Sequence, residues 1–159
     1  MNPNANLANV VLIVTAAVLS YAAVSDLKHY KIGNELIVLL IGLFVLHTLF
    51  SGRWGIAAWN FGLAAGVLAF LLFFYSRQWM GGGDVKLLAV AFLWTGIKCA
   101  LVFVILLLIF ASLHTVAAKL GWAQSQKTGN DDRRRLAFAP SVAAALIVTF
   151  LLGCLRSVT

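Results

Sequence analysis

Acidic residues are scarce in this chain of 159 residues, where five Asp and Glu stand against twelve Lys and Arg to give a net charge of +7 at pH 7. Only 11% of the residues are charged and 62% are hydrophobic, whereas a soluble domain is about 25% charged and about 45–50% apolar. One protein core could not bury this much apolar surface, so a lipid bilayer must cover the rest. The sequence shows no cluster of basic and aromatic side chains of the kind that binds single-stranded nucleic acid, and we expect no nucleic-acid partner.

Several signatures of other enzyme classes are also missing. Cys99 and Cys154 are the only cysteines and no CxxC pair occurs, so neither a zinc site nor a redox-active pair is predicted. The histidines, His29, His47 and His114, do not have HExxH spacing, and no GxSxG segment is present. A zinc peptidase and a serine hydrolase are therefore disfavoured. We expect no metal and no cofactor.

Long apolar runs predict an all-α, polytopic membrane protein of about six transmembrane helices, forming a single domain over residues 1–159. A helix needs about 20 mostly apolar residues to cross the bilayer. Residues 1–6 contain no Lys or Arg, so the first run lacks the basic start of a cleaved signal peptide. Residues 85–118 would be about 51 Å long as one helix, so we divide them at the segment Thr95-Gly96-Ile97-Lys98. The predicted spans are residues 7–25, 36–50, 56–76, 85–94, 97–118 and 136–155, with a glycine-rich break at 77–84 and a hydrophilic loop at 119–135.

The distribution of positive charge favours this division. Lys and Arg accumulate on the cytoplasmic side of membrane proteins. If both termini are outside, in the periplasm, nine of the twelve basic residues lie on the inner side and three on the outer side. An undivided fourth helix would weaken the ratio to five against seven. The inner set is Lys28, Lys31, Arg77, Lys86, Lys119, Lys127, Arg133, Arg134 and Arg135, and the outer set is Arg53, Lys98 and Arg156.

Gly62 and Gly66 form a GxxxG pair on the third predicted span. Small residues at this spacing let two helix backbones approach closely. We interpret the pair as an internal packing site, with a dimer contact as the alternative, and the oligomeric state is not predicted.

Asp26 and Asp84 are the candidates for a catalytic pair. Each lies at a span end that the charge pattern places on the cytoplasmic face, and each is followed two residues later by a lysine, Lys28 or Lys86. Ionisable residues at a membrane edge are functional candidates. Structural explanations stay open, because Asp26 could end its helix and Asp84 could cap the next one. The remaining acids have structural explanations, a helix start for Glu35 and a solvated loop for Asp131 and Asp132.

Three glycines, Gly81, Gly82 and Gly83, come directly before Asp84. Glycine loses the most backbone freedom when it is ordered, so such a run indicates a positive φ or the close approach of another backbone, with a flexible loop as the alternative. A peptide substrate beside two carboxyl groups would provide that approach. One ionised carboxylate can take a proton from water while the other, protonated, donates to the scissile carbonyl, because two nearby like charges share a proton.

These segments resemble the type IV prepilin peptidases, which are GxGD aspartyl proteases. Residues 81–88, GGGDVKLL, are similar to the family segment GGGD-x-K-LL, and residues 26–34, DLKHYKIGN, resemble D-x-(K/R)-x-x-x-I-P-N. The resemblance extends over essentially the whole chain and is greatest to the short, stand-alone form that serves tight-adherence (Flp) pili. Two positions depart from the pattern, since Gly33 and Ala137 stand where the family usually or often has proline.

The resemblance implies an endopeptidase of the bacterial inner membrane that removes the leader of prepilins or pseudopilins on the cytoplasmic side, after a glycine. Asp26 and Asp84 would be the catalytic pair, and Gly81 to Gly83, Lys28 and Lys86 would contact the substrate helix. Methyltransferase activity is not expected, because the region linked to it in larger members has no counterpart here. Two alternatives stay open, a small transporter or channel subunit and a catalytically decayed pilus-assembly membrane protein.

Overall fold

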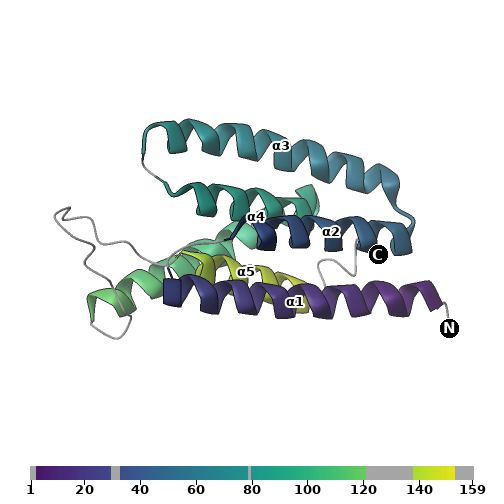
Figure 1. The fold of residues 1–159 in the computed structure, drawn as a ribbon, viewed down its shortest axis with the longest axis horizontal. Coiled ribbons are helices and arrows are strands. Elements are labelled where there is room, and N and C mark those ends of the chain that lie inside the picture. The colour runs from purple at the N-terminus through teal and green to yellow at the C-terminus, as the bar shows by residue number, and fades with distance from the viewer. Residues whose placement is uncertain (1–2, 30–32, 79, 121–137, 153–159) are drawn as a thin grey trace.

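The structure is a computed structural model that describes residues 3–29, 33–78, 80–120 and 138–152. Within these ranges the chain forms helices only, namely α1 (Pro3–His29), α2 (Asn34–Ser51), α3 (Trp54–Ser76), α4 (Gly82–Lys119) and α5 (Ala139–Leu151). The first four are long and apolar enough to cross a membrane, whereas α5 is shorter. The prediction of an all-α protein with several helices of spanning length is confirmed (Figure 1). The count of six spans and the side on which the termini lie stay predictions.

The chain doubles back within α4, at Gly96. This glycine has φ 59° and ψ −176° inside an otherwise helical segment. A straight helix would separate Phe92 from Phe103 by about 16 Å, yet the centroids of their rings are 5.4 Å apart. Figure 1 shows the second half of α4 returning toward the end at which α4 begins. The predicted division of this long run at residues 95–98 is confirmed.

Glycine is required at this turn for two reasons. The combination of a positive φ with a ψ near 180° is essentially restricted to glycine. In addition, a Cβ at Gly96 would lie 2.8 Å from Cγ of Asn60, a buried residue of α3. The side chain of Asn60 therefore occupies the space that a larger residue at the turn would need, and this contact fixes where α3 crosses the turn in α4.

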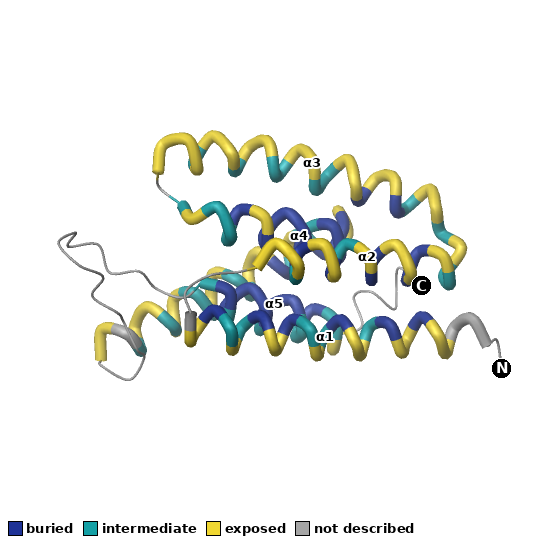
Figure 2. Tube along the Cα trace, in the orientation of Figure 1, coloured by how far each residue is buried: buried dark blue, intermediate teal, exposed yellow. Residues whose placement is uncertain are grey.

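The core lies between α5 and the first half of α4, where buried positions are most frequent along the chain (Figure 2). Trp94 of α4 is almost completely buried, and its indole N–H donates a hydrogen bond to the carbonyl of Leu40 in α2 at 3.2 Å. The ring of Trp94 also contacts Phe44 of α2 and Phe150 of α5. A buried tryptophan needs such a partner for its N–H, so these contacts fix the positions of three helices around one side chain.

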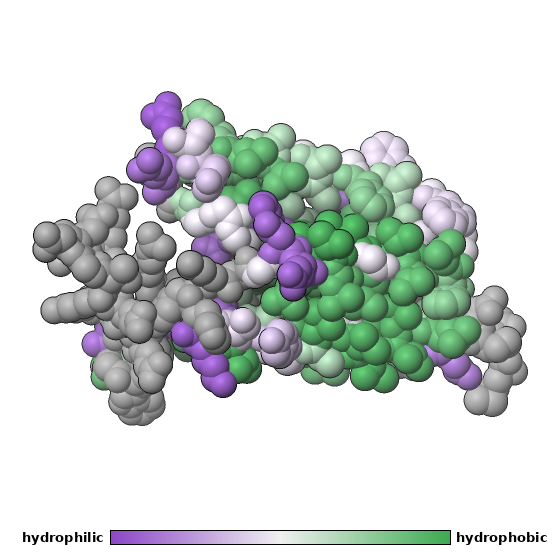
Figure 3. Space-filling model, in the orientation of Figure 1, coloured by the Kyte–Doolittle hydropathy of each residue, from purple (hydrophilic) through white to green (hydrophobic). Residues whose placement is uncertain are grey.

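The outer surface of the bundle is apolar. Figure 3 shows hydrophobic residues over most of the body, and most of the visible hydrophilic residues gather toward the end where α1 ends and α4 begins. Large side chains such as Ile13 and Trp59 are 70% and 74% exposed. Soluble proteins rarely leave contiguous apolar patches of this kind uncovered, and the surface is of the kind that lipid covers in a membrane protein.

The GxxxG pair of α3 does not pack against another helix. A Cβ added to Gly62 or Gly66 would meet no atom within 4 Å among the described residues, and both glycines are exposed. The buried residues of α3 are Ala57 and Asn60, which lie nearer its start. The expectation that Gly62 and Gly66 form an internal packing site is therefore wrong, because α3 turns a different face toward α4.

Cys99, three residues after the Gly96 turn, is completely buried and disulfide-bonded. Cys154, the only other cysteine in the sequence, lies outside the described residues. The sequence did not predict this bond, because its two cysteines have no spacing that indicates a disulfide.

We expect Gly96→Ala to lower the free energy of unfolding by about 2–4 kcal/mol, since it combines a disfavoured backbone conformation with a steric overlap. Adding Asn60→Ala should recover only the steric part of that loss. Thermal unfolding in detergent, followed by circular dichroism, would measure both effects. The matched control is Gly62→Ala, where the added methyl enters open space. Equal unfolding midpoints for Gly96→Ala and Gly62→Ala would contradict the role of the turn.

Gly33 precedes α2 and has φ −65° and ψ 139°, the backbone conformation of a proline. A Cβ there would meet nothing within 4 Å, so the departure from the proline of the family pattern leaves the backbone in the same conformation. We expect Gly33→Pro to stabilise the fold by about 0.4–1 kcal/mol, by restricting the unfolded chain. Gly52→Pro is the control and should destabilise it, because φ at Gly52 is +69°. A lower unfolding midpoint for Gly33→Pro would refute this interpretation.

Candidate active site

Asp26 and Asp84 meet at one end of the helical bundle. Asp26 lies in the last turn of α1 and Asp84 in the first turn of α4. Figure 1 shows these two helix ends, together with the start of α5, at the same end of the molecule, which we call the site end. The charge of Asp26 acts on Asp84, so the two carboxyl groups lie within electrostatic reach of each other. Both predicted acids thus lie at the same end of the bundle, and their role as a catalytic pair stays a prediction.

The short helix α5 holds this arrangement together. It packs against both α1 and α4, whereas α1 and α4 do not pack against each other in the described part of the chain. Asp26 is 5% exposed, and its Oδ2 accepts a hydrogen bond of 3.1 Å from the backbone N–H of Ala139, the first residue of α5. The helix end that carries Asp26 is therefore tied directly to α5, and α5 places it beside α4.

Asp84 lies within a helix and not, as the sequence analysis expected, in the break before one. α4 begins at Gly82, and the carbonyl of Gly81 accepts a hydrogen bond of 3.2 Å from the N–H of Val85. Gly81 thus precedes the helix, in the place that a capping residue would take. No hydrogen bond to the Asp84 carboxylate is present among the described residues, so capping does not explain this aspartate.

Two of the three glycines before Asp84 have close neighbours within the protein itself. A Cβ on Gly81 would lie 3.0 Å from Oδ2 of Asp84, and a Cβ on Gly82 would lie 3.2 Å from the ring of Tyr75 in α3. Directly after α3, Gln78 has a φ of 57° and donates its N–H to the carbonyl of Tyr75 at 2.9 Å. Gly81 therefore leaves room for the Asp84 carboxylate, and Gly82 leaves room for Tyr75.

Comparison with protein families decides the membership of the chain. The model of the type IV leader peptidase family matches residues 13–117, which include both aspartates and more than half of the chain. The chain belongs to the type IV leader peptidase family. Comparisons with curated proteins and with solved structures give no significant match. Family membership, together with the long apolar helices, identifies a membrane peptidase and confirms the resemblance found in the sequence.

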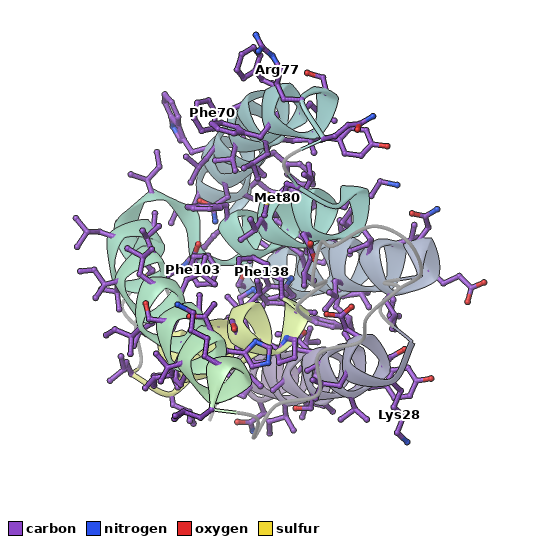
Figure 4. All side chains as sticks on the ribbon, turned by 90° about the vertical axis from the view of Figure 1, so that its left-hand side faces the viewer. Lys28, Phe70, Arg77, Met80, Phe103 and Phe138 are labelled. Atoms are coloured by element: carbon purple, nitrogen blue, oxygen red, sulfur yellow. The ribbon has the colours of Figure 1, made fainter. Side chains whose placement is uncertain are left out.

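The two lysines of this leader peptidase have different surroundings. Nζ of Lys86 donates a hydrogen bond of 2.8 Å to Oδ1 of Asn34, the first residue of α2. This bond joins the two segments that resemble the family motifs. Lys28 is exposed and extends outward from the rim in Figure 4, which views the site end, whereas Met80 and Phe138 lie nearer the centre. These positions do not test whether Lys28 or Lys86 contacts the substrate, and both contacts remain predictions.

His114 is a site residue that sequence reasoning missed. It lies on the second half of α4, and its charge acts on Asp26. The residue is far from both aspartates in the chain, and only the reversal of α4 at Gly96 returns it to the site end. No motif spacing could have revealed it. Across the described ranges, no group of three or more His, Cys, Asp and Glu residues could hold a metal ion.

We expect Gly81→Ala to slow cleavage of a leader-bearing substrate by roughly 10- to 100-fold, because displacing a catalytic group by a fraction of an ångström to an ångström has an effect of that order. The new methyl would push the Asp84 carboxylate away, while the φ of Gly81 is compatible with alanine. Initial rates with purified protein in detergent would measure the loss. Gly66→Ala, which adds the same methyl in open space, should retain the wild-type rate, and a wild-type rate for Gly81→Ala would exclude this role.

Proposed function

We propose that the chain is a multi-pass intramembrane aspartyl endopeptidase of the bacterial inner membrane, which removes the leader peptide of type IV, Flp-like prepilins or pseudopilins. Asp26 and Asp84 are its catalytic pair. The observation that carries the proposal is that the helix ends bearing these two carboxyl groups lie at the same end of an apolar bundle, where α5 packs against both helices. Family membership independently supports a leader peptidase.

The chemistry requires one ionised and one protonated carboxyl group. The ionised carboxylate accepts a proton from water as the water oxygen attacks the scissile carbonyl carbon, and the protonated carboxyl donates its proton to the carbonyl oxygen. The resulting tetrahedral diol collapses when the first carboxyl returns its proton to the amide nitrogen and the second takes a proton back from a diol hydroxyl. The peptide bond breaks, and both side chains regain their initial states.

Two features support cleavage on the cytoplasmic side. Lys28, Arg77, Lys86 and Lys119 lie near helix ends at the site end, and basic residues favour the cytoplasmic side of a membrane. The disulfide of Cys99 lies just after the Gly96 turn, away from that end. Structural disulfides persist in oxidising compartments such as the periplasm, so this bond favours a periplasmic position for the turn.

The location of the pair also separates this proposal from transport. Transporters bind substrates and ions near the middle of the bilayer, at interrupted helices. No described acidic residue lies at the interruption of α4 around Gly96, whereas Asp26 and Asp84 lie at helix ends. A pair at the rim suits a substrate that is itself a membrane helix, because the helix stays in the lipid while its leader extends into the cytoplasm. In this proposal, the residues that contact the leader are Gly81, Gly82, Gly83, Lys28 and Lys86.

We expect Asp26→Asn and Asp84→Asn each to reduce processing at least about 1,000-fold, because neither amide can exchange the protons that the reaction requires. The assay is co-expression with candidate pilins, with the loss of the leader read as a mass shift. The matched control is Glu35→Gln, which alters an exposed acid in the first turn of α2 and should leave processing intact. Membrane fractionation verifies that all three variants insert. Full maturation of a pilin by both Asp variants would end the proposal.

A further inference from the structure

The two aspartates have unequal surroundings, and this inequality assigns their roles. We propose that Asp26 is the ionised member of the pair and the base that activates water, and that Asp84 carries the shared proton and is the acid that protonates the scissile carbonyl. The helix α5 makes the difference, because its first N–H group binds only one of the two carboxylates. This inference rests on the proposed function, which names the pair but leaves the two roles unassigned.

The start of α5 leaves one backbone donor for Asp26. The N–H groups of Ser141 and Val142 both turn back to the carbonyl of Phe138, at 3.1 and 3.3 Å. Pro140 has no N–H to offer. The N–H of Ala139 is thus the remaining donor of the first turn, and it binds Oδ2 of Asp26 at 3.1 Å. A backbone N–H at a helix N-terminus favours the ionised form of a carboxylate, both as a hydrogen-bond donor and through the helix dipole.

Asp84 has no comparable donor. Among the described residues its carboxylate accepts no hydrogen bond, and its Oδ2 lies in the space beside Gly81, 3.0 Å from where a Cβ on that glycine would be. Among the described residues, the charge of His114 on α4 acts on Asp26, and the charge of Asp26 on α1 acts on Asp84. A protonated His114 attracts an ionised Asp26, whereas an ionised Asp26 repels a second negative charge on Asp84. Burial opposes the ionisation of Asp26, whereas the hydrogen bond from Ala139 and these two electrostatic interactions favour it and leave the proton on Asp84.

The assignment gives each step of the reaction a defined direction. Asp26 takes the proton from water while the water oxygen bonds to the carbonyl carbon, and Asp84 gives its proton to the carbonyl oxygen. On collapse, Asp26 returns its proton to the leaving nitrogen and Asp84 recovers one from the diol. Ala139 is a positioning residue in this scheme, since it acts through Asp26 and touches no reacting atom. Its backbone amide, and not its methyl group, performs this role.

The test observes the two carboxyl groups directly. Protein labelled with [4-¹³C]aspartate is titrated in detergent micelles by NMR, and Asp26→Asn and Asp84→Asn assign the two signals. Because the two titrations are coupled, the shifts report which carboxyl holds the proton at each pH. The expected result is that Asp26 ionises at a pH lower than Asp84 by about one unit or more. The reverse order, or a single common titration, would overturn the assignment.

A backbone substitution then tests whether the N–H of Ala139 causes the difference between the two carboxyl groups. Lactic acid incorporated at position 139 replaces the N–H by an ester oxygen without changing the side chain. We expect the Asp26 signal to move toward its protonated position at fixed pH, and the acidic limb of the pH–rate profile to rise by about one pH unit. The matched control is 2-hydroxyisovaleric acid in place of Val142. In the native chain, the N–H of Val142 donates only to the carbonyl of Phe138. If both esters shift the Asp26 signal equally, α5 is not the cause.

The two levels of proposal fail separately. Failure of the wild-type protein to cleave any leader, together with the expected NMR order, would reject the peptidase function and leave the asymmetry of the pair as a property of the fold. Cleavage by the wild type that both Asp→Asn variants abolish, together with the opposite NMR order, would retain the peptidase and reverse the two roles.

Discussion

A single hydrogen bond, from the N–H of Ala139 to the carboxylate of Asp26, connects the fold of this leader peptidase to its chemistry. The bond joins residues 113 positions apart, and it is buried. An uncompensated carboxylate in such a place would be strongly unfavourable. The start of α5 must therefore lie against the end of α1 whenever Asp26 is ionised. Because α5 also packs against α4, the same constraint fixes the distance between α1 and the helix that carries Asp84.

The sequence predicted those features that depend on residues close together in the chain. Apolar runs located the four long helices, and the small and polar residues at 95–98 located the reversal within α4. Asp26 and Asp84 stood out because few acids exist in this chain and both fall at span ends. The starting point of α4 was placed too late, because glycines were interpreted as a break when they form the first helical turn. Ala137, the second departure from the family pattern, lies outside the described residues.

The features that escaped prediction all depend on contacts between distant parts of the chain. The bond between Lys86 and Asn34, the approach of His114 to Asp26, and the donor at Ala139 arise only once the helices have packed. Gly62 and Gly66 illustrate the opposite error, since a motif that permits close helix packing does not require it. For the glycines before Asp84, the sequence predicted one feature correctly and missed another. Their composition indicated a close approach, but the nearest partners of Gly81 and Gly82 are side chains of the protein itself.

Hydrolysis needs water, and the hydrocarbon core of a membrane excludes it. A catalytic pair that works on a membrane-embedded substrate is therefore best placed at a rim, where water and lipid are both within reach. Asp26 is almost completely buried, whereas Asp84 is partly exposed. Water and the scissile bond must then approach from the side of Asp84 and the Gly81 turn. The buried carboxylate is held by a hydrogen bond from α5, and the more accessible one lies beside Gly81, where a larger residue would crowd it. Under the proposed assignment of roles, a base held in one place by α5 keeps the attacking water in one position, while the acid at the open side meets the carbonyls of leaders of different sequence.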